Sequence, residues 1–123
     1  MVNIYVILSI LFFHWLFDFV FQTDSQAKGK SKEWGYLLEH TGIYSICWFV
    51  PLITYLIIFP YAPDTIEFFI PITFICHTAT DYYTSRVNSQ LLDSENTHGF
   101  FVSVGFDQFL HFVQLLLTFY LLT

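Results

Sequence analysis

The chain has 123 residues, of which 55% are hydrophobic and 22% aromatic, whereas only 11% are charged. Soluble domains carry about 25% charged residues, and a chain this short buries only part of its surface on folding. The composition therefore favours insertion into a membrane over a soluble fold, and the net charge of −6 argues against nucleic-acid binding, which needs a basic surface.

Four apolar stretches predict four transmembrane helices. They cover residues 3–22, 37–59, 67–86 and 99–122, and a helix needs about 20 residues to cross the hydrocarbon core. The first stretch has no basic leader and no small-residue cleavage site, so we interpret it as a retained helix rather than a signal peptide. Pro51 is expected to kink the second helix. The sequence therefore predicts an all-α fold, a four-helix transmembrane bundle that forms one domain over residues 1–123.

The segments between these stretches predict the orientation of the chain. We expect a polar loop over 24–36, a short proline-containing turn over 60–66 and a second polar loop over 87–98. The basic residues are Lys28, Lys30 and Lys32 in the first loop, and Arg86 at the end of the third stretch. By the positive-inside rule, the first and third loops face the cytoplasm and both termini lie outside.

The polar residues inside the apolar stretches follow one spacing. Three stretches place a His and an Asp four residues apart, and a further His opens the remaining stretch: His14 with Asp18, His40, His77 with Asp81, and Asp107 with His111. Four residues span about one helical turn, so each pair shares a helix face. The helical rise places all seven groups in the cytoplasmic half of the membrane. Since unpaired polar groups are costly to bury, we expect one shared cluster, and the pattern suggests two helix hairpins related as a parallel repeat.

Imidazole and carboxylate groups together point to a divalent transition metal such as zinc, manganese or iron. All seven residues are candidate ligands, and Asp18, Asp81 and Asp107 are also candidate catalytic carboxylates. One metal could take three or four of them, or two metals could share the set. A metal-bound water would permit hydrolysis. The lysine-rich first loop would suit a phosphoester or a lipid headgroup as the substrate.

Two other interpretations of the cluster stay open. The same residues could tie the helices together by hydrogen bonds without a metal, or they could carry protons or ions across the membrane. Gln108 could join the cluster or face a neighbouring helix, and Tyr44 could donate a hydrogen bond into it or simply pack. Association into a homo-oligomer is also left open by the uniformly apolar surface.

The stretch from His14 to Asp24 (HWLFDFVFQTD), followed by Ala27, Lys28 and Lys30, resembles the opening of a family of small multispanning proteins from bacteria and phages. That family is catalogued as a domain of unknown function. Its later motifs are matched by a His at the start of the second span, His-x-x-x-Asp in the third and Asp-Gln-x-x-His in the fourth: His40, His77 with Asp81, and Asp107-Gln108 with His111.

This resemblance covers nearly the whole chain and implies a four-helix protein of the bacterial inner membrane, without an established activity. A more distant likeness is to membrane-bound metal-dependent hydrolases that carry His and Asp inside the membrane. The expected function is therefore a metal-dependent membrane hydrolase. The alternative is a non-enzymatic membrane module, either a proton- or ion-coupled carrier or a phage-type protein that acts on a host membrane partner.

Overall fold

The computed structural model describes residues 3–60 and 64–123, and all regular structure within these ranges is helical. The elements are α1 (Ile4–Trp15), the π-helical turn η1 (Leu16–Val20), α2 (Asp24–Gly29), α3 (Trp34–Cys47), α4 (Phe49–Ile58), α5 (Asp64–Asp93) and α6 (Thr97–Leu122). The expectation of an all-α fold is confirmed.

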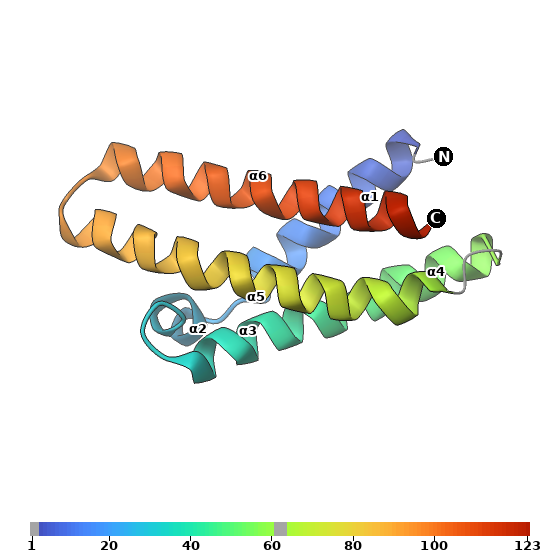
Figure 1. Ribbon diagram of the computed structural model, residues 1–123, viewed down its shortest axis with the longest axis horizontal. Coiled ribbons are helices and arrows are strands. Elements are labelled where there is room, and N and C mark those ends of the chain that lie inside the picture. Colours follow the sequence, from blue (N-terminus) through green and yellow to red (C-terminus); the bar gives the residue numbers. More distant parts are fainter. Residues whose placement is uncertain (1–2, 61–63) are drawn as a thin grey trace.

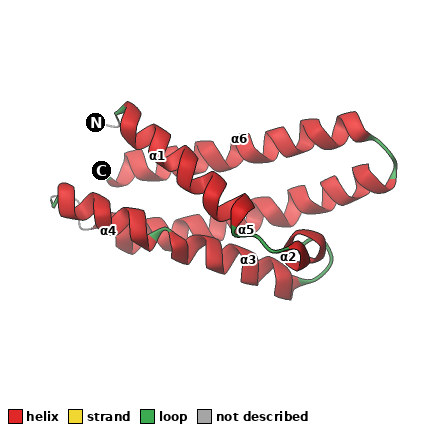
Figure 2. Cartoon of the chain, turned by 180° about the vertical axis from the view of Figure 1, so that it is seen from behind, coloured by secondary structure: helices red, strands yellow, loops and turns green. Residues whose placement is uncertain are grey.

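The long helices α5 and α6 form an antiparallel hairpin against which α1, α3 and α4 pack, whereas α2 packs against α3 (Figure 1). α3 and α4 run along α5, and α1 crosses this layer obliquely, as the view from behind also shows (Figure 2). Both ends of the chain lie at one end of the bundle, together with α4. The short helix α2 and the α5–α6 connection lie at the opposite end, which is called the α2 end below.

The expected kink in the second apolar stretch appears as a break between α3 and α4. Pro51 cannot donate to the carbonyl of Cys47, and its ring crowds that carbonyl. α3 ends at Cys47, and the Trp48 amide bonds to Ser45 at 3.3 Å in a tighter turn before α4 begins.

Two expected loops are wrong in extent. Residues 24–36 contain α2, and α3 already begins at Trp34. The loop over 87–98 is reduced to three residues, because α5 continues to Asp93 and α6 begins at Thr97. Polar residues are compatible with a helix, so polarity alone did not mark the helix end; the chain turns at Glu95, whose φ is 58°. Of the expected turn over 60–66, residues 61–63 lie outside the described residues.

Two helical segments are long and apolar enough to cross a membrane, judged by length and composition alone. They are Trp34–Ile58, with 25 residues, and Thr97–Leu122, with 26 residues. Ile4–Val20 is a shorter apolar helix. These segments coincide with three of the four stretches predicted from the sequence.

The protein exposes many large apolar side chains, and part of its interior is polar. Large apolar side chains lie on the surface; Ile57, Ile75 and Leu121, for example, are 77%, 65% and 77% exposed. Toward the chain termini the interior is apolar, with Ile10, Phe17, Tyr44, Trp48, Leu52, Phe69, Leu115 and Phe119 in contact. Next to this apolar core, the interior is filled by histidine, aspartate, threonine and serine side chains.

The first turn of α2 generates a stability prediction. Thr23 and Gln26 form a capping box, in which the Thr23 hydroxyl accepts from the Gln26 amide at 3.2 Å and the Gln26 side chain accepts from the Thr23 amide at 3.1 Å. Thr23→Ala removes one half of this box, so the free energy of unfolding should fall by about 1 kcal/mol. Circular dichroism of the detergent-solubilised protein during thermal unfolding measures the change.

Thr54→Ala is the matched control, because the Thr54 hydroxyl bonds only to the Val50 carbonyl of its own helix on an exposed face. It should change the unfolding free energy by less than about 0.5 kcal/mol. Equal effects of the two substitutions would contradict the capping role of Thr23.

Candidate metal centre

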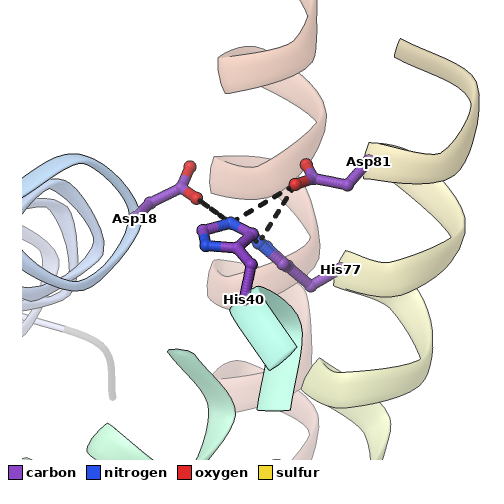
Figure 3. Close-up of side chains that lie close together, drawn as sticks. All are labelled: Asp18, His40, His77 and Asp81. Atoms are coloured by element: carbon purple, nitrogen blue, oxygen red, sulfur yellow. Dashed lines mark hydrogen bonds and ion pairs between the residues drawn. The ribbon is translucent and has the colours of Figure 1, made fainter. Parts of the chain in front are cut away.

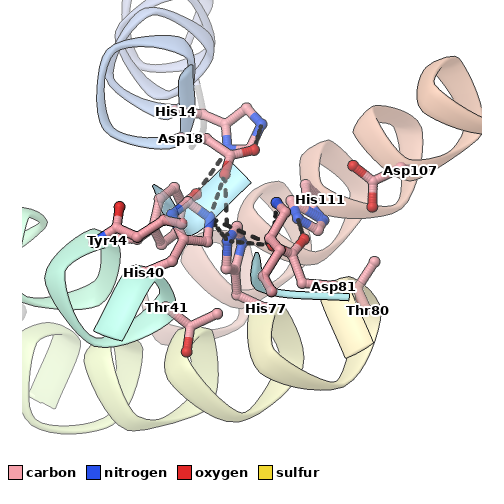
Figure 4. Close-up of polar contacts among 12 residues, drawn as sticks. His14, Asp18, His40, Thr41, Tyr44, His77, Thr80, Asp81, Asp107 and His111 are labelled. Carbon is pink, nitrogen blue, oxygen red and sulfur yellow. Dashed lines mark hydrogen bonds and ion pairs between the residues drawn. The ribbon is translucent and has the colours of Figure 1, made fainter. Parts of the chain in front are cut away.

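Seven His and Asp side chains meet inside the bundle, and each is at most 8% exposed. They come from α1, η1, α3, α5 and α6, and Figure 4 shows them pointing toward one another: His14, Asp18, His40, His77, Asp81, Asp107 and His111. The expectation that these residues gather in one cluster is therefore met by the geometry.

Four of the seven form the centre of the cluster, where their polar atoms converge (Figure 3). His40 Nε2 lies 3.0 Å from Asp18 Oδ1 and 3.3 Å from Asp81 Oδ2. His77 Nε2 lies 3.4 Å and 3.7 Å from the same two oxygens. The two imidazole nitrogens are 3.3 Å apart. Two carboxylate oxygens and two imidazole nitrogens thus surround one point.

These separations are close to those expected between the ligands of a tetrahedral metal ion. A tetrahedral ion with bonds of about 2.0–2.2 Å to nitrogen and oxygen holds its ligands about 3.3–3.6 Å apart. The five distances given above run from 3.0 to 3.7 Å. Asp18, His40, His77 and Asp81 could therefore hold a metal ion with little movement.

A second group shares Asp81 with the first. Asp81, Asp107 and His111 also bring ligand atoms within 4.8 Å of one another. Asp81 Oδ2 faces His40 and His77, whereas Asp81 Oδ1 lies 3.1 Å from His111 Nε2. Each oxygen of Asp81 therefore faces a different group of side chains, and Asp81 could supply a ligand atom to either group.

A π-helical turn carries Asp18 to the cluster. The sequence predicted a regular helix through His14 and Asp18, but η1 replaces the α-helical turn, and the Phe21 amide bonds to the Leu16 carbonyl five residues back at 3.0 Å. His14 Nε2 and Asp18 Oδ2 remain 3.5 Å apart. Single π turns of this kind inside α-helices are frequent at functional sites.

His14 lies at the edge of the cluster, and both of its ring nitrogens are hydrogen-bonded. The Tyr44 hydroxyl lies 2.7 Å from Nδ1, and the Gln108 Oε1 atom lies 2.8 Å from Nε2. The Gln108 amide nitrogen donates to Asp107 Oδ2 at 3.0 Å, which fixes its oxygen toward His14. These bonds are satisfied together when Tyr44 donates to Nδ1 and Nε2–H donates to Gln108. The structure thus places His14 beside the two groups of candidate metal ligands, and it brings Gln108 and Tyr44 into the cluster.

Tyr44 also fixes the ring of His77. The two rings stack with centroids 3.9 Å apart and planes 10° apart. Beside them, the Thr78 hydroxyl donates to Thr41 Oγ1 at 2.8 Å and joins α5 to α3. A ring held on one face in this way has little rotational freedom, so its Nε2 atom stays directed at the two carboxylates.

Lys30 is a member of the site that the sequence reasoning missed. Lys30 is the residue that follows α2, and its Nζ atom donates a hydrogen bond to Asp81 Oδ2 at 2.7 Å. Burial by itself would lower the pKa of Lys30, but attraction by the Asp81 and Asp18 carboxylates outweighs it and holds the pKa above its ordinary value. Lys30 is therefore a cation fixed against the shared carboxylate. Its position among three closely spaced lysines gave no signal that it alone points inward.

Comparison with known proteins identifies the family. Searches of curated proteins and of solved structures find no match to the chain. The model of the family described as "Protein of unknown function (DUF3307)" matches residues 6–123. This range includes all seven cluster residues and confirms the resemblance noted from the sequence motifs. The chain belongs to this DUF3307 family.

Proposed function

We propose that the protein is a metal-dependent hydrolase of the bacterial inner membrane. In this proposal four helical spans, α1–η1, α3–α4, α5 and α6, cross the bilayer with both chain termini outside. The divalent transition metal (zinc, manganese or iron) is held by the buried His and Asp residues. The substrate is a phosphoester that reaches the site from the cytoplasm or from the inner leaflet.

The exposed apolar surface supports the membrane location. In the most apolar windows of the α3–α4 segment and of α6, only 28% and 17% of residues are buried inside the protein, whereas the core helix of a soluble protein is mostly buried. A lipid bilayer would cover this surface. Lys28, Lys30 and Lys32 all lie at the α2 end, which the positive-inside rule assigns to the cytoplasm.

The convergence of Asp18, His40, His77 and Asp81 is the observation that carries the metal proposal. Without a metal, His77 Nε2 meets its carboxylate neighbours only at 3.4 and 3.7 Å and lies 3.3 Å from another imidazole nitrogen. Those distances are long for hydrogen bonds to a carboxylate, which are about 2.7–2.9 Å. One cation at the centre could bind both imidazole nitrogens and Asp18, and it would compete with Lys30 for Asp81 Oδ2.

Asp107 is the candidate base for hydrolysis. One of its oxygens accepts from the Thr84 hydroxyl at 2.5 Å and the other accepts from the Gln108 amide at 3.0 Å, so the carboxylate is held rigidly. A metal lowers the pKa of a bound water to near neutrality and so supplies hydroxide as a nucleophile. Asp107 lies within the group that shares Asp81, where it can accept a proton from such a water.

A proton- or ion-coupled carrier is the second candidate, and the continuity of the hydrogen bonds favours it. A chain of bonds runs from Tyr44 through His14, Gln108 and Asp107 to Thr84. Histidine and aspartate chains of this kind relay protons in membrane transporters. In this function Lys30, and not a metal, would be the counter-ion of Asp81. Flux in vesicles that is lost in His14→Ala, in a protein that never contains metal, would favour the carrier.

The metal proposal predicts that the purified protein holds a transition metal in about stoichiometric amount. His40→Ala and His77→Ala each remove a proposed ligand. Loss of a residue that only orients a ligand lowers metal affinity about 10- to 100-fold, so these two substitutions should lower the metal affinity by more than that. Elemental analysis of detergent-purified protein, prepared without chelator and resupplied with zinc, manganese and iron, measures the content. Acidification should also release the metal, because only the neutral imidazole binds it.

His98→Ala is the control for this experiment, since His98 is an exposed residue in the first turn of α6. It should leave the metal content unchanged. A parent protein that takes up no metal after resupply would end the metal proposal and leave the hydrogen-bonded relay as the better account.

The catalytic role of Asp107 predicts a separation of metal binding from turnover. Asp107→Asn keeps the side-chain shape and leaves the four central ligands intact, so metal in the central group should be retained. Hydrolysis of a phosphoester such as p-nitrophenyl phosphate should fall by about 10²- to 10⁴-fold. Asp93→Asn, at the exposed end of α5, is the matched control. Full activity in Asp107→Asn would remove Asp107 from the mechanism.

A further inference from the structure

A basic cavity adjoins the metal centre at the α2 end of the bundle. Its volume is about 420 Å³, and it lies between the segment around α2 and the last turns of α5. The polar and basic residues that line it are Lys28, Lys30, Lys32, Ser85, Asn88 and Ser89, together with Ser31. Among the described residues that line it, none is acidic.

The charge of this cavity contrasts with that of the chain. The protein has ten acidic residues, four basic ones and a net charge of −6. Three of the four basic residues nevertheless line this one cavity. Lys30 is already paired with Asp81, but Lys28 and Lys32 would still attract an anion into the cavity. The cavity therefore selects for an anionic ligand.

Two buried polar atoms in the cavity wall lack a partner. Within residues 3–60 and 64–123, Ser85 Oγ and Asn88 Oδ1 are buried without a hydrogen bond. Ser85 is only 8% exposed. Because unsatisfied buried polar groups are costly and rare, such atoms indicate a missing ligand or water. The Ser85 hydroxyl can donate to an anionic oxygen, and Asn88 Oδ1 can accept from a hydroxyl group of the same ligand.

Lys30 and Ser85 connect the cavity to the metal centre. Lys30 lines the cavity, and its Nζ atom lies 2.7 Å from Asp81 Oδ2. Ser85 follows Asp81 by one turn on the same face of α5. A ligand in the cavity would therefore reach the shared carboxylate of the metal centre through Lys30, which is already in contact with it.

The length of α5 supports an accessible position at the membrane surface. Its 30 residues extend about 45 Å, whereas the hydrocarbon core is about 30 Å thick. The last turns of α5, which carry Ser85, Asn88 and Ser89, would then lie at the level of the lipid headgroups or in the adjoining cytoplasm.

We propose that this cavity binds the phosphate group of the substrate and presents it to the metal centre. The lysine ammonium groups and the Ser85 hydroxyl hold the phosphate oxygens, while the scissile bond lies toward Asp81. The catalytic consequence rests on the proposed hydrolase function, but the binding can be measured independently of turnover. The phosphate belongs either to a soluble phosphate compound or to a phospholipid headgroup, and the chemistry recognised is the same.

Binding is measured with the metal-loaded protein in nanodiscs of phosphatidylcholine. Isothermal titration with inorganic phosphate and with glycerol 3-phosphate tests the soluble source. Native mass spectrometry of protein in nanodiscs that contain phosphatidic acid or phosphatidylglycerol tests the lipid source. Saturable binding of a soluble probe, or selective retention of an anionic lipid over phosphatidylcholine, supports the proposal and identifies the source.

Two substitutions that leave every proposed metal ligand in place locate the binding. Lys32→Gln removes one cavity cation and Ser85→Ala removes the unpartnered hydroxyl, so each should weaken binding about tenfold. Arg86→Gln removes a positive charge from the same part of α5. Arg86 stacks on the Tyr82 ring, bonds to the Tyr82 carbonyl and does not line the cavity. Ser94→Ala removes an exposed hydroxyl that bonds to Leu91. Both controls should leave binding within about twofold of the parent, since neither residue lines the cavity.

The outcomes separate this inference from the proposed function. If the parent retains metal but binds neither soluble phosphate nor anionic lipid, the cavity proposal is overturned and the metal centre stands. If Arg86→Gln weakens binding as much as Lys32→Gln, the attraction is a general property of the surface, and the proposal is also overturned. If phosphate binds and depends on Ser85 in a protein that never holds metal, the cavity assignment stands and the hydrolase does not.

Discussion

The burial of Asp18 and Asp81 is the constraint on which the rest of the structure depends. A carboxylate removed from water loses several kcal/mol of solvation unless cations or hydrogen-bond donors replace the water. The bundle supplies His40 and His77 to both carboxylates, and Lys30 to one of them. These partners come from different helices, so the helices must meet at one level. The polar side chains are therefore gathered in the interior, and the apolar side chains of the same helices are left on the exterior.

Much of this arrangement could be predicted from the sequence, because the helical spacing of the polar residues and the free-energy cost of burying them unpaired both indicate a shared cluster. An apolar helix that carries His and Asp one turn apart must pair them with something, and three such helices carried matching pairs. The cluster residues could therefore be predicted where their partners are also polar residues within apolar stretches. His14 differs from the others: Tyr44 and Gln108 bond to both of its ring nitrogens, and neither of the two groups whose ligand atoms lie close together includes it.

Features that depend on the path of the backbone could not be predicted. The π turn at Leu16–Val20 has no residue signature, since Phe, Val and Leu are ordinary in an α-helix. The continuation of α5 to Asp93 was hidden because polar residues suit a solvated helix as well as a loop. The inward direction of Lys30 depends on α2, a six-residue helix held by its capping box.

In the proposed membrane setting, α5 and α6, with 30 and 26 residues, are longer than the hydrocarbon core. A hairpin longer than the hydrocarbon core can tilt or slide, and mismatch costs fractions of a kcal/mol per Å. The buried charges stay with the helices, so a thicker membrane would draw the α2 end below the headgroups and a thinner one would expose it to water. The acyl-chain length of the lipids would then control how readily water and ligands reach the buried polar cluster, with no change in any residue of the protein.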